Sequence, residues 1–274
     1  MGFDITYHPV RIDEMNSWFF EPVKAMKDGD ESILKSVIEA QGEGFFGEKY
    51  EFIIKDIASR YTEFPSEKGI LYAMAACIGL FRKYQYVRGS SFSFLIERAP
   101  EMDKYRTPWI EVLPSWVPAP GSDTITEIYS SGVFIGHDKV KELLADIEND
   151  ENVHSAILDA FGEANLGVFI KALQDAAGTD SGVMEATEIM EVNPFDLNNS
   201  SCNSDIMNCD PEGALIYQEV AMEQVKEATG MNENEIAENV VYQKTNTELP
   251  SGNSNTENVD KPKKGLLSRL LKRK

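Results

Sequence analysis

The sequence has few cysteines and no long apolar run, and these absences exclude two classes of protein. Three cysteines among 274 residues do not build the dense disulfide framework of a small secreted domain. No run of about 18 apolar residues occurs, so no membrane-spanning helix is predicted. The opening string MGFDITYHPV lacks the basic and apolar regions of a signal peptide. We therefore expect a cytoplasmic protein.

Basic residues are scarce except at the C-terminal end. The formal net charge is −20, from 26 Lys and Arg against 46 Asp and Glu. Residues 261–274 contribute +7 without a single acid, so the other 260 residues carry −27. A body with this charge repels the phosphates of nucleic acids. The composition thus predicts no nucleic-acid partner and favours a protein partner, in particular a basic one.

The string QGEGFFG at residues 41–47 has the G-x-G-x-x-G spacing of dinucleotide-binding loops. That fingerprint requires a strand that leads into the glycines. Residues 31–40 instead carry apolar side chains at helical spacing, which predicts a helix. We expect Gly42 to end this helix in the left-handed conformation, with Phe45 and Phe46 packed across the corner. No nucleotide or other cofactor is predicted.

A polar stretch at residues 193–213 is longer than most connections inside compact domains, and such loops are often functional. It supplies Asp205, Cys209 and Asp210, and His137 precedes a predicted helix elsewhere in the chain. These side chains are the candidates for a hydrolase-like active site. The histidines and cysteines lack the spacing of metal ligands, so no metal site is predicted. No catalytic motif ranks the candidates, and the catalytic residues stay unassigned.

Strands and helices are predicted in both halves without strict strand–helix–strand order, which favours an α+β fold with a helix-rich body and a few short strands. The closely spaced prolines around Trp109 and Trp116 favour a connector whose tryptophans pack into the body. The predicted segments are a mainly helical N-terminal subdomain at 1–107, a Pro/Trp-rich connector at 108–122, an α+β subdomain at 123–230, a flexible, disordered linker at 231–260 and a basic amphipathic tail at 261–274.

The tail has leucines at i, i+1, i+4 and i+5 with basic residues between them, so it is amphipathic if it forms a helix. Three interpretations stay open. The tail makes a weak contact with the anionic inner face of a membrane, docks in a groove of a partner or of its own acidic body, or is a solvated end. The candidate contact residues are Leu266, Leu267, Arg269, Leu270, Leu271, Lys272 and Arg273.

Two strings, MGFDITYHPV and NCDPEGALIYQE, are similar to a group of uncharacterised bacterial proteins, with the similarity extending over most of residues 1–230. The resemblance implies a bacterial cytosolic origin and a folded body, and it supplies no catalytic residue. Our leading hypothesis is a non-enzymatic acidic binding protein of the adaptor or immunity type. The alternatives are a hydrolase-like enzyme that uses the 193–213 loop and a peripheral membrane protein attached through its tail.

Overall fold

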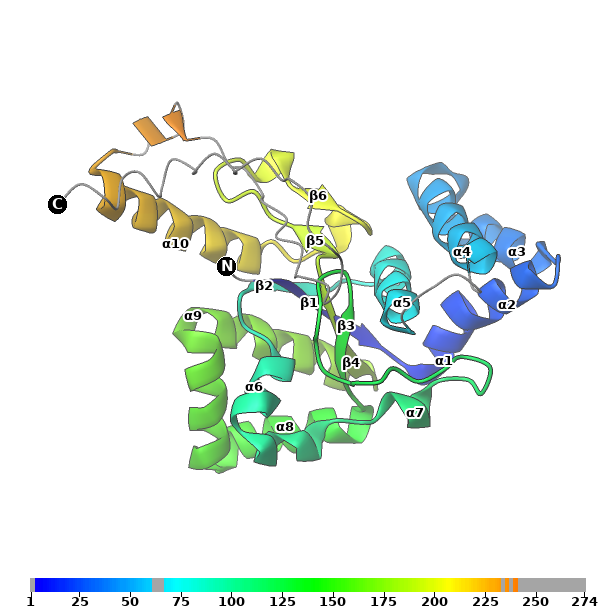
Figure 1. Cartoon of the computed structure of the whole chain (residues 1–274), viewed down its shortest axis with the longest axis horizontal. Coiled ribbons are helices and arrows are strands. Elements are labelled where there is room, and N and C mark those ends of the chain that lie inside the picture. The colour runs from blue at the N-terminus through cyan, green and yellow to red at the C-terminus, as the bar shows by residue number, and fades with distance from the viewer. Residues whose placement is uncertain (1–2, 61–66, 233–234, 237–238, 241–274) are drawn as a thin grey trace, which may run out of the picture. The chain divides into compact units, whose positions relative to one another are not determined.

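The computed structural model describes residues 3–60, 67–232, 235–236 and 239–240 (Figure 1). The chain up to Val240 forms one compact unit. Within it, helices dominate and a few short antiparallel strands form the sheets, which confirms the predicted α+β class. Most of the predicted linker and the whole predicted tail lie outside the described residues.

The main sheet has four antiparallel strands in the order β2-β1-β4-β3. Their bounds are Asp4–Val10 for β1, Gln85–Arg88 for β2, Ser131–Ile135 for β3 and Gly182–Thr187 for β4. In the centre of the sheet, Tyr7 lies opposite Gln85 on one side and Glu185 on the other. The sheet therefore joins strands of the predicted 1–107 and 123–230 subdomains, and these two segments belong to one compact unit.

Most of the remaining structure is helical. The N-terminal half contains α1 (Ile12–Met15), a π-helical turn (Asn16–Phe20), α2 (Glu21–Lys27), α3 (Ser32–Gln41), a second π-helical turn (Glu43–Gly47), α4 (Glu48–Arg60), α5 (Glu67–Phe81), α6 (Phe92–Arg98), a 3-10 helix (Pro100–Tyr105) and α7 (Trp109–Val112). The C-terminal half contains α8 (His137–Asn149), α9 (Glu151–Gly178), the short strands β5 (Met190–Glu191) and β6 (Ser201–Cys202), two 3-10 turns (Leu197–Asn199 and Ile206–Asn208) and α10 (Glu212–Thr229).

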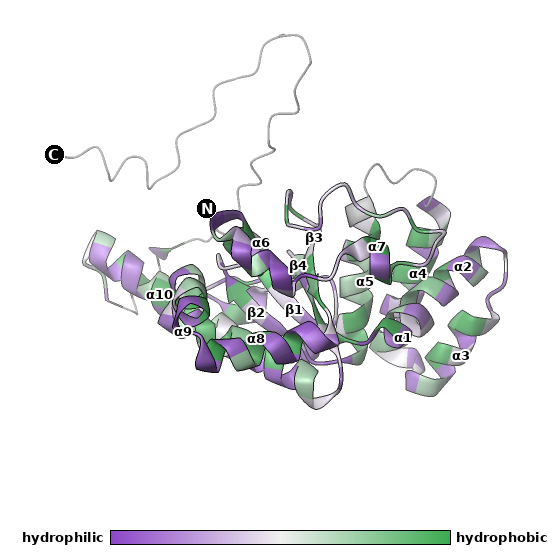
Figure 2. Cartoon of the chain, turned by 90° about the horizontal axis from the view of Figure 1, so that it is seen from below, coloured by the Kyte–Doolittle hydropathy of each residue, from purple (hydrophilic) through white to green (hydrophobic). Residues whose placement is uncertain are grey.

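Helices cover both faces of the sheet because side chains alternate along its strands. Ile5 and Tyr7 of β1 lie in a core shared with α6, α8 and α9. On the opposite face, Met184 and Ala186 of β4 pack with α5 and the N-terminal helices. Figures 1 and 2 show α5 on one side of the strands and α8 and α9 on the other. The sheet is thus the central layer between two helical layers.

The connector protects the outer edge of β3. Trp109 is fully buried, and its indole Nε1 donates a hydrogen bond to the Gly132 carbonyl at 2.9 Å. The backbone N–H of Thr107 donates to the Phe134 carbonyl at 2.8 Å. Trp116 packs against the core through Phe20. The predicted packing of both tryptophans is confirmed, and these contacts occupy carbonyls at an edge that would otherwise be open to strand pairing.

The glycine-rich string at 41–47 joins two helices, as the sequence predicts. Helix α3 runs into Gly42, which has a φ of 120° and ψ of 145°. This backbone has the positive φ that favours glycine but differs from the left-handed helical cap that we predicted. Phe46 packs on Phe81 with ring centroids 5.0 Å apart, whereas Phe45 is 57% exposed, so only one of the two predicted corner contacts forms.

Candidate functional site

The polar 193–213 loop is fixed to the body by hydrogen bonds to α5 and to the residues before β2. The Ser204 hydroxyl donates to the Ala76 carbonyl at 2.7 Å, and the Asn208 side-chain amide donates to the Gly79 carbonyl at 3.0 Å. The Asn208 carbonyl accepts from the N–H of Tyr84 at 3.0 Å. These hydrogen bonds give the loop a defined conformation. A functional loop and a purely structural loop both have this property, so it does not distinguish between the two roles.

The three loop candidates each have a structural role. Asp205 accepts a hydrogen bond from the Met207 N–H at 2.9 Å and begins a 3-10 turn. Asp210 accepts from Lys171 Nζ at 2.9 Å. Burial acts to raise its pKa, but Lys171, the Glu212 N–H and Lys83 together outweigh burial and hold the pKa below its usual value. Cys209 is buried, and this burial raises the pKa of its thiol, which keeps it protonated.

His137 lies near a different group of residues. It is the first residue of α8, directly after edge strand β3, while the loop candidates follow the opposite edge of the sheet at β2. Its Nε2 is 3.5 Å from the Asp180 carboxylate, and Lys141 Nζ is at the same distance from that oxygen. The structure therefore groups Asp205 with Cys209 and Asp210 along the loop and does not bring His137 to them.

The predicted tail contacts, Leu266 to Arg273, lie outside the described residues and stay predictions. In the described ranges, every helix is too short or too polar to cross a membrane. Over the same part of the chain, His, Cys, Asp and Glu side chains form no group of three or more that could hold a metal ion.

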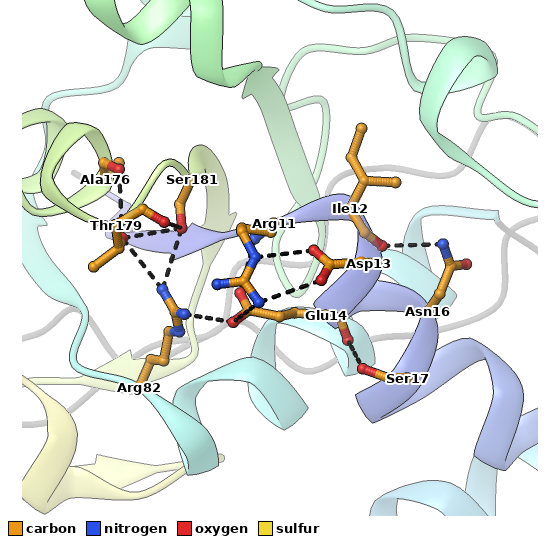
Figure 3. A network of polar contacts seen from close by, with 10 residues as sticks. All are labelled: Arg11, Ile12, Asp13, Glu14, Asn16, Ser17, Arg82, Ala176, Thr179 and Ser181. Carbon is orange, nitrogen blue, oxygen red and sulfur yellow. Dashed lines mark hydrogen bonds and ion pairs between the residues drawn. The ribbon is translucent and has the colours of Figure 1, made fainter.

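The sequence did not single out a polar network at the C-terminal end of β1 (Figure 3). At its centre lies Glu14 of α1, which is only 5% exposed. Its carboxylate accepts from the Arg11 N–H at 3.0 Å, lies 3.0 Å from Arg11 Nη2 and accepts from Arg82 Nη2. Arg82 Nη1 also donates to the hydroxyls of Thr179 at 3.3 Å and Ser181 at 3.1 Å. We call these five residues the Glu14 network.

The topology explains why residues so far apart in the sequence meet here. Arg11 directly follows β1, Arg82 directly follows α5, and Ser181 directly precedes β4. Val10 lies opposite Gly182 in the sheet, so the end of β1 and the start of β4 are adjacent. Two guanidinium groups face one buried carboxylate, and Arg11 also bonds the exposed Asp13 at 3.0 Å. The network therefore neutralises a buried charge and links α1, α5 and β4.

Replacing Arg82 should show how much this link stabilises the fold. We expect Arg82→Ala to lower the free energy of unfolding by about 2 kcal/mol, because the buried Glu14 carboxylate loses a charged donor. Arg60, whose ion pair with Asp56 is on the surface, provides the matched control, and Arg60→Ala should change stability by less than about 0.5 kcal/mol. Urea unfolding monitored by circular dichroism measures both. Equal effects of the two substitutions would contradict a stabilising role of Arg82.

Comparison of the chain with protein-family models, with curated proteins and with solved structures found no match. No residue role is transferred from another protein, and the sequence resemblance adds no site. The function must therefore be argued from the charges, the exposed side chains and the hollows of this chain itself.

Proposed function

We propose that this chain is a non-enzymatic binding protein whose acidic body engages a protein partner, as an adaptor or an immunity-type protein does. The observation that carries the proposal is the exposed face of α10. Glu219, Glu223 and Glu227 are exposed and follow one another at i, i+4 spacing. Like charges at this spacing destabilise a helix by about 0.2–0.5 kcal/mol per pair, and a basic partner would relieve that cost.

The same helix also exposes apolar side chains. Leu215 is 46% exposed and Val220 is 45% exposed, while Ala214 and Ala221 on the other face are buried and Gly213 is buried at the start of the helix. Helix α10 begins in close contact with β2, since a Cβ atom on Gly213 would lie 1.7 Å from the Tyr86 carbonyl oxygen. A well-anchored helix with acidic and apolar residues on its outer face suits protein recognition, where apolar contacts give affinity and charges give specificity.

The alternatives receive less support. For the hydrolase hypothesis, Asp205 and Asp210 already hold the loop through hydrogen bonds, and His137 lies at the other edge of the sheet, away from both. For the membrane hypothesis, an acidic body is repelled by an anionic bilayer, so the tail alone would have to provide the attraction. Binding of a basic protein, in contrast, is favoured by the negative charge that residues 1–260 carry.

An affinity pull-down from native bacterial lysate tests the proposal. The full chain and a version ending at Asp260 serve as baits at low and moderate salt, and mass spectrometry identifies what each retains. We expect one protein held in near-stoichiometric amount by both versions. Retention of nothing by either version, or of lipid and envelope proteins by the full chain only, would contradict a partner-binding body.

A further inference from the structure

A surface hollow of about 500 Å³ lies beside α10, between this helix, Phe195 and the residue Ile236. Its apolar lining consists of Phe195, Met222 and Ile236, and Glu219 and Glu223 line it from the helix. Lys226 contributes one positive charge to the lining. The hollow thus combines apolar side chains with two carboxylates on consecutive turns of one helix. We call it the α10 hollow.

We propose that the α10 hollow binds a basic amphipathic helix of the partner protein. This inference rests on the proposed function and names the surface and the chemistry of the partner. Helix-in-groove recognition places the apolar residues of an amphipathic helix into a groove and its charged residues along the rim. Here the partner helix would set leucine-type side chains against the partly exposed Phe195 and Met222, beside the fully buried Ile236, and Lys or Arg side chains against the two glutamates.

The spacing of the two carboxylates suits a helical partner. Residues four apart on a helix have Cβ atoms roughly 5–6 Å apart. Glu219 and Glu223 therefore match two basic residues that are also one helical turn apart on the partner. Met222 lies between them in sequence, and the flexible, polarizable methionine side chain adapts to apolar groups of different shapes. A helix with leucines along one face and basic residues along the adjoining face meets both requirements.

The charge of the whole molecule favours the same class of partner. The chain outside residues 261–274 carries −27, so its field attracts a basic segment and repels phosphates and acidic peptides. Exposed Glu227 adds a further carboxylate one turn beyond Glu223, which extends the acidic row past Lys226. This complementarity predicts fast association that weakens as salt screens the charges.

The test measures binding of a fluorescein-labelled synthetic helix, acetyl-GKLLKRLLKKLLG-amide, to the full chain by fluorescence anisotropy. A scrambled peptide of the same composition, without an apolar face, is the peptide control. We expect the amphipathic peptide to bind at least tenfold more tightly than the scrambled one. The double variant Glu219→Lys, Glu223→Lys should weaken binding at least tenfold, and Met222→Ala should weaken it about threefold.

A matched charge control separates the hollow from the net charge of the protein. Glu148 and Glu163 are exposed on α8 and α9, and the variant Glu148→Lys, Glu163→Lys makes the same change of +4 in charge away from the hollow. It should weaken binding less than threefold. Circular dichroism of each variant confirms that the fold is kept. Equal weakening by both double variants would overturn the inference, because only the overall field would then matter.

The remaining outcomes distinguish this inference from the proposed function. If the pull-down retains a partner that the variant Glu219→Lys, Glu223→Lys still retains in full, the α10 hollow is the wrong surface and the proposed function stands. If the pull-down retains no protein, the proposed function is contradicted, regardless of whether the synthetic peptide binds. If light scattering shows a dimer of the full chain that this variant abolishes, a second copy occupies the hollow. If the version ending at Asp260 binds the peptide at least tenfold more tightly than the full chain does, the chain's own basic segment at 261–274 occupies it. Either result overturns our partner assignment.

Discussion

Glu185→Ala is expected to lower the free energy of unfolding by about 4 kcal/mol, a large share of the stability of an ordinary domain. Glu185 lies in β4 next to Tyr7 of β1 and is 1% exposed. A carboxylate in such a position is tolerated only when hydrogen-bond donors surround it. The substitution would remove the acceptor and leave several buried donors without a partner.

The donors come from α6, the neighbouring strands and the side chains between them. Glu185 Oε1 accepts from the Phe92 N–H at 2.7 Å and from the Tyr7 hydroxyl at 3.0 Å. Oε2 accepts from the Ser93 N–H at 3.2 Å, from the Ser93 hydroxyl and from the Val133 N–H at 3.4 Å. Glu185 therefore joins β4, β1 and β3 to the first turn of α6, and its loss would loosen all four.

Urea unfolding of three variants at pH 7.5 tests this prediction. Glu185→Gln keeps the shape and one acceptor oxygen, so we expect it to cost about 2 kcal/mol, between wild type and Glu185→Ala. Glu163→Ala removes an exposed glutamate of α9 and should change stability by less than about 0.5 kcal/mol. A cost below about 1 kcal/mol for Glu185→Ala would show that the five hydrogen bonds are not a stabilising network.

The sequence predicted those parts of the fold that depend on local periodicity. In the sequence, apolar and polar residues alternate along β1, and apolar residues recur at helical spacing in α4, α5, α8 and the helix that runs into Gly42, so these elements can be recognised locally. Cys77 stands among apolar residues in the sequence and is fully buried in α5. Such features can be predicted without knowing which residues the element contacts in the folded protein.

Elements fixed by distant contacts were missed. The string SSFSFLIERAP, which contains α6, favours a short strand from its sequence alone. In the structure Ser91 caps a helix there by accepting from the Phe94 N–H, and Glu185 accepts from the first two N–H groups of that helix. The four-residue strand β2 is too short to show a period and is defined by its pairing with β1. Such features depend on residues about 90 positions away, which no local pattern reveals.

The same limit applies to the sites. Glu14 and Glu185 are two of 46 acidic residues, and only the fold shows that both are buried among donors. Asp205 and Asp210 were candidate catalytic residues because they lie in a long polar loop. Their carboxylates instead accept hydrogen bonds that hold the loop and the start of α10. The acidic row of α10 was not singled out from the sequence, and the hollow beside it is formed with Phe195 and Ile236 from outside the helix.

His8 is expected to make the protein sensitive to mild acid. It lies in β1, is fully buried and stacks on Tyr84 with ring centroids 4.8 Å apart. The Thr6 hydroxyl donates to the Ala186 carbonyl at 3.3 Å, so its oxygen accepts from His8 Nε2–H at 2.9 Å. His8 Nδ1 has no hydrogen-bond partner among the described residues. This arrangement suits the neutral ring and gives no acceptor to a second N–H.

Burial lowers the pKa of His8 from 6.5 to about 3. The unfolded chain therefore binds a proton below pH 6.5 that the folded chain does not take up until about pH 3. Stability falls throughout this window as the pH decreases, by about 1.4 kcal/mol per pH unit in its middle. At pH 4.5 we expect a loss of about 3 kcal/mol relative to neutral pH. Burial raises the pKa of Glu185, which has the opposite effect on stability, whereas the lowered pKa values of Asp103 and Asp210 act in the same direction as His8. Wild type alone therefore does not isolate the contribution of His8.

Comparison with His8→Gln isolates this contribution, because Glu185 is present in both proteins and its effect subtracts. Glutamine keeps an N–H donor for Thr6 but does not titrate, so the variant should lose about 3 kcal/mol less than wild type between pH 7.5 and pH 4.5. The control is His154→Gln, which makes the same exchange at an exposed histidine of α9. Urea unfolding at pH 7.5, 6.0, 5.0 and 4.5 provides the free energies. If His8→Gln loses stability in acid as steeply as wild type does, His8 is not the group that takes up the proton on unfolding, and the neutral buried ring is the wrong description of this part of the core.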